Sequence, residues 1–328
     1  MFDFIGNIFS PSHYHGQSKK NDYFEGWFYK LVDSKGDNIF AIIPGVFISK
    51  DKTKEHSFIQ ILNGKNHESH YCKFSFDEFQ SKKDKFEIEI GNSIFTEEFI
   101  KLEIERENIS LKGKLHFDKL KPWPITLFSP GIMGWYSYVP YMECNHGVVS
   151  LNHSLSGILL NNQKEINFDG GKGYIEKDWG SSFPSSYVWM QTNHFEKENV
   201  SFTGSVARIP WRSSWFRGFI AGLLIEDKLY RFATYTGAKL KYLYVDDKEI
   251  KFEISDRKYK IEITAERTIS GQLHAPYENE MLERVSESLD GKVKIILTDK
   301  RNNEILFDGI GLHAGIEANG KLEEIVDE

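Results

Sequence analysis

The chain has 328 residues, a formal net charge of −7 at pH 7, and a composition that is 40% hydrophobic and 14% aromatic. This length allows two domains of ordinary size or one large all-β domain. The charges are well mixed and the balance is acidic, which excludes the basic stripe that nucleic-acid binding requires. Cys72 and Cys144 lie far apart without metal-ligand spacing, so we expect two reduced thiols rather than a disulfide framework or a zinc site.

The first residues carry no sign of export or membrane insertion. An acidic residue, Asp3, comes early, and neither a basic region nor an apolar run of signal-peptide length follows. No stretch reaches the about 18 apolar residues that a membrane-spanning helix needs. We therefore expect a soluble, cytoplasmic protein without a transmembrane segment.

Short segments with strand character fill the first part of the chain. Residues 21–30 are rich in aromatics, residues 38–48 are apolar, and residues 101–106 alternate charged with apolar side chains. Alternation with a period of two, between polar or glycine turns, predicts the strands of an antiparallel sheet. Residues 121–140 interrupt this pattern with four prolines and an apolar composition, and we expect a lid-like crossing that covers or lines a site.

The second half continues in the same style. Strand-like segments joined by short polar turns recur between residues 200 and 315, and regular spacing of this kind predicts a sandwich or barrel. One short helix is predicted at residues 276–288, where Met281, Leu282 and Val285 recur at helical spacing.

These patterns predict an all-β protein made of two units of comparable size. The boundary is placed at the end of the central glycine-rich motif. The predicted domains are residues 1–185 and residues 186–328.

That central motif, residues 170–184, is the most informative part of the chain. Its glycines, Gly170, Gly171 and Gly173, are interpreted as tight-turn residues. They are followed by Tyr174, by the carboxylates of Glu176 and Asp178, and by the indole of Trp179. After Pro184, the alternation puts four side chains on one face of a strand: Tyr187, Trp189, Gln191 and Asn193. Two aromatics followed by two amides favour a ligand site, and the alternative is that the amides satisfy loop backbone groups.

Three stretches of the sequence resemble the tocopherol cyclase family. They are residues 23–30 (Tyr-Phe-Glu-Gly-Trp-Phe-Tyr-Lys), a central set at 171–180, 182–184 and 189–193, and a C-terminal set at 273–276, 287–288 and 309–317. Together they span nearly the whole chain in the order of the family.

The resemblance implies a pair of lipocalin-like β-barrel domains packed together. It also implies a hydrophobic site for an isoprenoid or prenylated quinol and a cofactor-independent activity, an intramolecular lyase or isomerase that closes a ring. Such a protein would touch a membrane surface at most transiently, to collect its substrate.

Ring closure of this type needs an acid that protonates an alkene and walls that tolerate the resulting cation. Glu25 fits this description because Tyr23 and Trp27 share its strand face, and burial among rings raises the pKa of a carboxyl group. Asp178, beside Trp179, is the rival acid. A paired interior carboxylate for Glu25 and a hydrogen-bonded structural anchor for Asp178 remain the alternatives.

The remaining candidate residues are one carboxylate and three histidines. Glu176 alternates with Asp178 and is expected to be solvated. His146, His153 and His194 show neither HxH nor HExxH spacing, so no metal site is predicted.

Two other functions stay open at this point. One is a non-catalytic carrier of an isoprenoid or lipid. The other is a carbohydrate-acting protein, which would need the carboxyl groups of Glu25 and Asp178 about 5–9.5 Å apart across an open cleft.

Overall fold

The structure, a computed structural model, describes residues 8–20, 22–139, 142–277 and 279–327. Within these residues the chain forms strands joined by short turns, and no helix is long and apolar enough to cross a bilayer. The helical elements described in full are short 3-10 segments, namely η1 (Gly16–Ser18), η2 (Phe76–Glu78), η3 (Gly134–Tyr138), η4 (Thr234–Thr236) and η5 (Leu322–Glu324).

The chain divides into two compact units. The first comprises Met1–Phe183 with Gln272–Arg284, and the second comprises Pro184–Gly271 with Val285–Glu328. The predicted domain boundary after residue 185 stays a prediction, and the structure adds that residues 272–284 group with the first unit. In that unit the side-chain amide of Gln60 exchanges two hydrogen bonds with the backbone of His274, at 2.8 and 2.9 Å.

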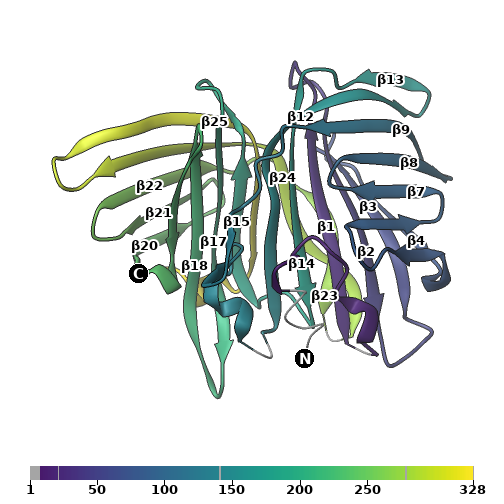
Figure 1. Cartoon of the computed structure of the whole chain (residues 1–328), viewed down its shortest axis with the longest axis horizontal. Helices are drawn as coiled ribbons and strands as arrows, with labels where there is room; N and C mark the ends of the chain where they lie inside the picture. The colour runs from purple at the N-terminus through teal and green to yellow at the C-terminus, as the bar shows by residue number, and fades with distance from the viewer. Residues whose placement is uncertain (1–7, 21, 140–141, 278, 328) are drawn as a thin grey trace. The chain divides into compact units, whose positions relative to one another are not determined.

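The large sheet of the first unit is antiparallel and has twelve strands (Figure 1). Along its hydrogen-bonded order the strands are β4 (Ser69–Phe74), β3 (His56–Asn63), β2 (Ile39–Ile48), β1 (Tyr23–Val32), β14 (Gly171–Gly180), β12 (Cys144–Asn161), β9 (Ile109–Asp118), β8 (Phe99–Arg106), β7 (Ser93–Thr96), β6 (Glu87–Ile90) and β5 (Phe79–Ser81). Strand β13 (Lys164–Asn167) pairs with β12, and β10 (Ile125–Thr126) forms a separate hairpin with β11 (Ser129–Pro130).

The second large sheet has eleven strands. Its order is β19 (Lys228–Ala233), β18 (Ser214–Ile225), β17 (Val200–Trp211), β15 (Ser186–Thr192), β25 (Glu304–Gly320), β24 (Glu280–Asp299), β22 (Tyr259–Glu266), β21 (Glu249–Ser255) and β20 (Lys239–Val245). Strand β16 (His194–Phe195) pairs with β25, and β23 (Gly271–Tyr277) pairs with β24.

The predicted all-β class is confirmed, and the curved antiparallel sheets are of the lipocalin-like kind (Figure 1). The order of one sheet ends at β4 and β5, and that of the other at β19 and β20. Among the described residues, therefore, neither sheet closes into a complete ring of hydrogen bonds.

Alternation along the strands builds a separate core in each unit. In β8, Ile100, Leu102 and Ile104 are buried while Lys101 and Glu103 between them are exposed. Strands β1 and β2 differ, because nearly every residue of both is buried, as expected for strands covered on both faces. The position of β1 inside the sheet therefore buries any polar side chain that it carries.

The helix predicted at residues 276–288 is wrong. The segment forms the end of β23 and the beginning of β24. Leu282, which a helix would bury beside Val285, is 40% exposed, whereas Val285, Glu287 and Leu289 alternate into the interior. Pairing with β23 and β25 satisfies the backbone of this segment and overrides its local helical spacing.

Gly113 allows β9 and β12 to lie close together. Its φ is +138°, and a Cβ added there would lie 2.2 Å from the carbonyl oxygen of Ile158 on the neighbouring strand. Gly131 also has a positive φ, +78°, but an added Cβ would meet nothing within 4 Å. An added side chain would therefore meet both backbone strain and a steric clash at Gly113, but backbone strain alone at Gly131.

We expect Gly113→Ala to lower the free energy of unfolding by about 3 kcal/mol, because strain and a backbone clash act together. Gly131→Ala serves as the matched control and should cost about 1 kcal/mol, from strain alone. Urea denaturation of both variants measures the difference. Equal losses would show that the contact between the two strands is not tight.

Candidate functional site

Strand β14 positions the candidate site because it pairs with β1 on one side and with β12 on the other. In this register Glu25 lies opposite Trp179, and Asp178 lies between Gly26 and His146. Cross-strand partners share a face and successive residues alternate, so Glu25 and Asp178 point to opposite faces of the sheet. The two predicted acids are thus not brought together, and they do not form the carboxylate pair that a carbohydrate-acting site would need.

Glu25 lies on the core face and is fully buried. Its Oε1 lies 2.5 Å from Lys177 Nζ, whose side chain is also 0% exposed. Its Oε2 accepts a 2.6 Å hydrogen bond from the hydroxyl of Tyr23, and the backbone N–H of His15 donates to the carboxylate at 2.9 Å. The carboxylate is therefore held by a cation and two neutral donors.

The ammonium group of Lys177 is enclosed by aromatic rings, as sequence reasoning expected for Glu25. Its Nζ lies 5.0 Å from the centre of the Trp27 ring and 4.6 Å from that of Trp179. It also donates a hydrogen bond to the carbonyl oxygen of His13, and Trp27 Nε1 donates to that of Ser12 at 2.8 Å. The two rings and the carbonyl oxygen of His13 stabilise this buried cation.

Burial disfavours both charges of this pair and therefore shifts the two pKa values in opposite directions. Desolvation lowers the pKa of Lys177 to about 8, although Glu25 opposes the shift. Desolvation likewise raises the pKa of Glu25, with Lys177 and Tyr23 opposing. The expected upward shift at Glu25 is present, but sequence reasoning missed its partner, Lys177.

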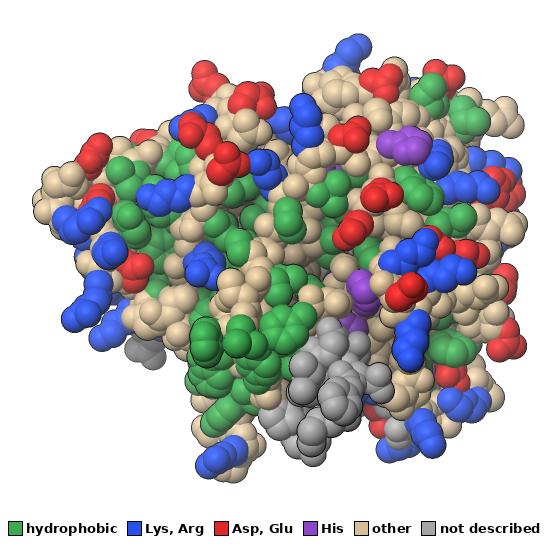
Figure 2. All heavy atoms as spheres, viewed as in Figure 1, with side chains coloured by type: hydrophobic (Ala, Val, Ile, Leu, Met, Phe, Trp, Pro, Cys, Tyr) green, Lys and Arg blue, Asp and Glu red, His purple; other side chains and the backbone are tan. Residues whose placement is uncertain are grey.

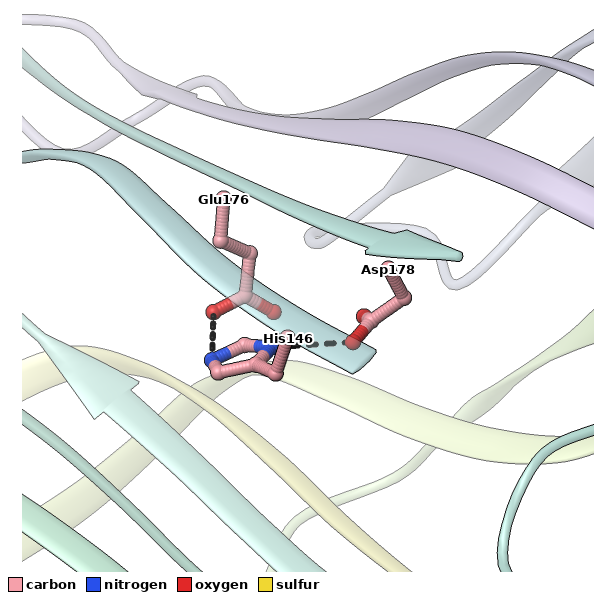
Figure 3. Close-up of side chains that lie close together, drawn as sticks. All are labelled: His146, Glu176 and Asp178. Atoms are coloured by element: carbon pink, nitrogen blue, oxygen red, sulfur yellow. Dashed lines mark hydrogen bonds and ion pairs between the residues drawn. The ribbon is translucent and has the colours of Figure 1, made fainter. Parts of the chain in front are cut away.

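On the other face of β14, His146 lies between two carboxylates (Figure 3). Its Nδ1 lies 2.9 Å from Asp178 Oδ1, and its Nε2 lies 3.5 Å from Glu176 Oε2. The hydroxyl of Tyr174 donates a hydrogen bond to the same Glu176 oxygen. Four titratable groups therefore form a chain from Tyr174 to Asp178.

Exposure differs along this chain. The side chain of Glu176 is 6% exposed, and those of His146 and Asp178 are 17% and 26% exposed. The expectation that Glu176 is solvated is wrong, because its carboxylate lies against Tyr174 and His146 and its side chain is buried. Asp178 is the most solvent-exposed of the three side chains.

The same three residues could hold a metal ion. One ligand atom each from His146, Glu176 and Asp178 lies within 4.8 Å of the others. The imidazole contacts a carboxylate through each ring nitrogen, however, so a cation would have to replace one of these contacts. As it stands, the imidazole of His146 bridges the two carboxylates.

The predicted aromatic and amide side chains of the second unit lie on β15. Tyr187, Trp189 and Gln191 alternate with Val188 and Met190, which belong to the hydrophobic core of that unit. The first three side chains therefore share the face opposite the core, and all three are buried, as is Asn193 just beyond the end of the strand.

Sequence reasoning did not assign two carboxylates of this unit. Glu287 on β24 lies opposite Glu317 on β25 and is 0% exposed. Glu317 accepts a 2.5 Å hydrogen bond from the hydroxyl of Tyr187. Only the register of the strands places these carboxylates beside the predicted residues.

Gly173, interpreted from the sequence as a tight-turn residue, lies inside β14. A Cβ there would lie 2.1 Å from His153 Nε2, so the glycine makes room for a buried imidazole. That ring contacts Phe117, with centroids 4.7 Å apart, and its Nδ1 lies 3.1 Å from Ser150 Oγ. Burial lowers the pKa of His153 to about 3.

Comparison with known proteins identifies relatives. A family model described as tocopherol cyclase-like matches residues 116–320, a stretch that contains His146, Glu176 and Asp178. A maize protein described as a chloroplastic tocopherol cyclase is 23% identical over 202 residues. That match covers 57% of this chain and 41% of the maize protein, so the chain spans less than half of the relative's length.

Solved structures share the fold at low sequence identity. Kievitone hydratase from Nectria haematococca is 12% identical and superposes with a TM-score of 0.51, over 94% of each chain. The protein CghA in complex with Sch210972 is 9% identical and gives a TM-score of 0.55, over 91% of this chain and 88% of its own. At these identities the likeness shows the fold alone.

We expect Lys177→Met to lower the free energy of unfolding by about 3–5 kcal/mol, because Glu25 would be left as a buried anion without its cation. Adding Glu25→Gln to this variant removes both charges and should restore a large part of the loss. Urea denaturation measures both effects. A double variant no more stable than the single one would show that the shape of Lys177, rather than the charge pair, provides the stability.

The low pKa of His153 predicts a loss of stability in mild acid. Its folded pKa of about 3 lies below the unfolded value of 6.5, so the unfolded chain takes up a proton that the folded chain does not. The contribution of the neutral ring is fully present above pH 6.5 and is lost as the pH falls towards 3.

From pH 7 to pH 5 we expect His153 to account for about 2 kcal/mol of lost unfolding free energy. His153→Leu should make the pH dependence shallower by that amount in urea titrations at the two pH values. Identical slopes for the two proteins would contradict a neutral, buried imidazole.

Proposed function

Because the chain belongs to the tocopherol cyclase-like family, we propose that it is a cyclase that acts on a hydrophobic, prenylated quinol-like molecule. It protonates an alkene of this substrate and closes a ring, and the reaction uses groups of the chain itself. The family supports a cyclase-like function in general terms. The residues of the site support the assignment of the acid.

The observation that carries the proposal is the position of His146 between Asp178 and Glu176 (Figure 3). Two carboxylates on one imidazole hold a proton in place, because either can accept a hydrogen bond from the ring. Asp178 is the partly exposed end of the chain and Glu176 the buried end. We therefore assign Asp178 as the acid that meets the substrate.

Glu25 suits this role less well. Its carboxylate is fully buried, and Lys177, the Tyr23 hydroxyl and the backbone N–H of His15 already occupy both of its oxygens. A proton donor has to be both protonated and within reach of the alkene. We propose that Glu25 positions Lys177 and the surrounding rings instead.

The proposed reaction conserves its protons. The Asp178 proton forms a new C–H bond at the less substituted alkene carbon and leaves a tertiary cation. The phenol oxygen then forms the C–O bond, and its proton returns to the Asp178 carboxylate, directly or through His146. Substrate and product are isomers, which requires no redox partner.

The roles expected of Tyr187, Trp189, Gln191 and Asn193 remain predictions about the second unit. Aromatic rings there would bind an apolar tail, and amide groups would hold a hydroxyl or a carbonyl group.

We expect Asp178→Asn to lower kcat/KM by about 10²–10³ when the purified protein is incubated with prenylated quinols and the chromanol is quantified by mass spectrometry. His146→Gln should give a smaller loss, since the acid remains but loses its partner. Asp118→Asn, at an exposed end of β9, is the matched control. In D₂O the product should carry one deuterium on carbon.

Turnover that survives both Asp178→Asn and His146→Gln would contradict the assigned acid. A prenylated ligand that is retained in native mass spectrometry but never converted would contradict the cyclase and support a carrier instead.

A further inference from the structure

A hairpin of the first unit holds large apolar side chains in solvent. Thr126 of β10 pairs with Ser129 of β11, which leaves Leu127 and Phe128 at the tip of the turn. Leu127 is 66% exposed and Phe128 is 84% exposed. The lid-like crossing expected over residues 121–140 stays a prediction: these two tip side chains face solvent, whereas Trp123, Ile132 and Met133 of the same segment are buried.

Two further exposed aromatics belong to the turn that follows. Trp135 is 46% exposed and Tyr138 is 38% exposed, both within η3. We call residues 125–138 the apolar hairpin. Figure 2 shows hydrophobic side chains gathered low on the face in view, in the area where Figure 1 draws a short blue-teal helical turn.

Polar bonds hold the apolar hairpin in shape. The hydroxyl of Tyr138 donates a 2.6 Å hydrogen bond to the carbonyl oxygen of Leu127, directly at the tip. Ser137 Oγ donates to the carbonyl oxygen of Pro130 at 3.1 Å, and the backbone N–H of Ser129 donates to Thr126 Oγ1 at 3.1 Å. The exposed side chains are thus presented by an organised turn.

The chemistry of this surface defines its partner. Exposed apolar side chains grouped together mark a contact surface. Leucine and phenylalanine suit an acyl-chain layer, and tryptophan and tyrosine suit the headgroup level because they combine an apolar ring with a polar atom. A single surface that offers both environments is a lipid bilayer.

Charge selects the kind of bilayer. Lys119 and Lys121 lie shortly before the apolar hairpin, and no aspartate or glutamate occurs between Asp118 and residue 139, in a chain whose net charge is −7. Two lysines beside an apolar surface favour anionic over neutral headgroups.

We propose that the apolar hairpin docks the protein onto an anionic membrane surface, with Leu127 and Phe128 inserted among the acyl chains and Trp135 and Tyr138 at the headgroups. This inference does not depend on the reaction proposed above. It would place the protein where a prenylated molecule dissolves.

The second unit offers a stringent comparison. The tip of its β17–β18 hairpin carries Trp211 and Trp215, 40% and 39% exposed, beside Arg212. It resembles the apolar hairpin in composition but lacks aliphatic and phenylalanine side chains as exposed as Leu127 and Phe128. This second hairpin tests whether aromatic and basic residues alone are sufficient for binding to a membrane surface.

The experiment is co-sedimentation of the full chain with vesicles of phosphatidylcholine, alone or mixed with phosphatidylglycerol. We expect binding to the mixed vesicles that weakens with salt. The Leu127→Ser, Phe128→Ser double variant should lose at least about tenfold in affinity, because two exposed apolar side chains no longer insert. Its unfolding midpoint should stay unchanged, since both side chains are already in solvent.

The matched control is Ile269→Ser with Ile305→Ser, which removes two other exposed apolar side chains, 71% and 59% exposed. Equal losses in the two double variants would overturn the proposal, as would unchanged binding of the hairpin variant. A loss confined to Trp211→Ser with Trp215→Ser would move the contact to the second unit and overturn it as well.

A dimer that disappears in the Leu127→Ser, Phe128→Ser variant during analytical ultracentrifugation, without vesicle binding, would assign the surface to a second copy of the chain. That outcome also overturns the proposal. Ring closure of a substrate supplied in detergent is measured separately, so the failure of either proposal is distinguishable from the failure of the other.

Discussion

The backbone ladder of β14 is the constraint on which the candidate site depends. Hydrogen bonds to β1 and to β12 fix its register on both sides. Because strand side chains alternate, adjacent residues of the motif are sent to opposite faces: Lys177 to the core and Asp178 away from it. A slip of one residue would exchange the two faces and leave both polar clusters without their partners.

The core face shows how a buried charge is tolerated. Transferring Glu25 and Lys177 out of water is costly, and their attraction compensates only if the remaining donors and acceptors are satisfied. Tyr23, His15 and the carbonyl oxygen of His13 provide those contacts. The pair therefore fixes the N-terminal segment against β1 and β14 and leaves little freedom for Glu25 to exchange protons with a ligand.

The opposite face carries the groups that we propose for catalysis. His146 joins the buried carboxylate of Glu176 to the partly exposed carboxylate of Asp178. The second unit follows the same division of faces along β15, with Val188 on the core side and Trp189 and Gln191 on the other. In both units, function is assigned to the strand face that the unit's own apolar core does not use.

The sequence by itself determined the features that depend on local pattern. Period-2 alternation gave the all-β class, and the alternation after Pro184 correctly put Tyr187, Trp189 and Gln191 on one face, because a strand's periodicity is a local property. The same reasoning failed at residues 276–288, where spacing compatible with a helix also fits a strand and the partners β23 and β25 decide.

Only the tertiary structure decided which distant residues meet. His146 is thirty-two positions from Asp178, and Lys177 is far from Glu25, so their contacts follow from strand order and register, which local pattern does not encode. The burial of Glu176 and the exposure of Phe128 also follow from the tertiary structure, because Tyr174 and His146 lie against the carboxylate and solvent surrounds the phenylalanine ring. The local sequence predicted Glu25 and Asp178 as candidate acids. The pairing of β14 with β1 and β12 places these two side chains on opposite faces of the sheet.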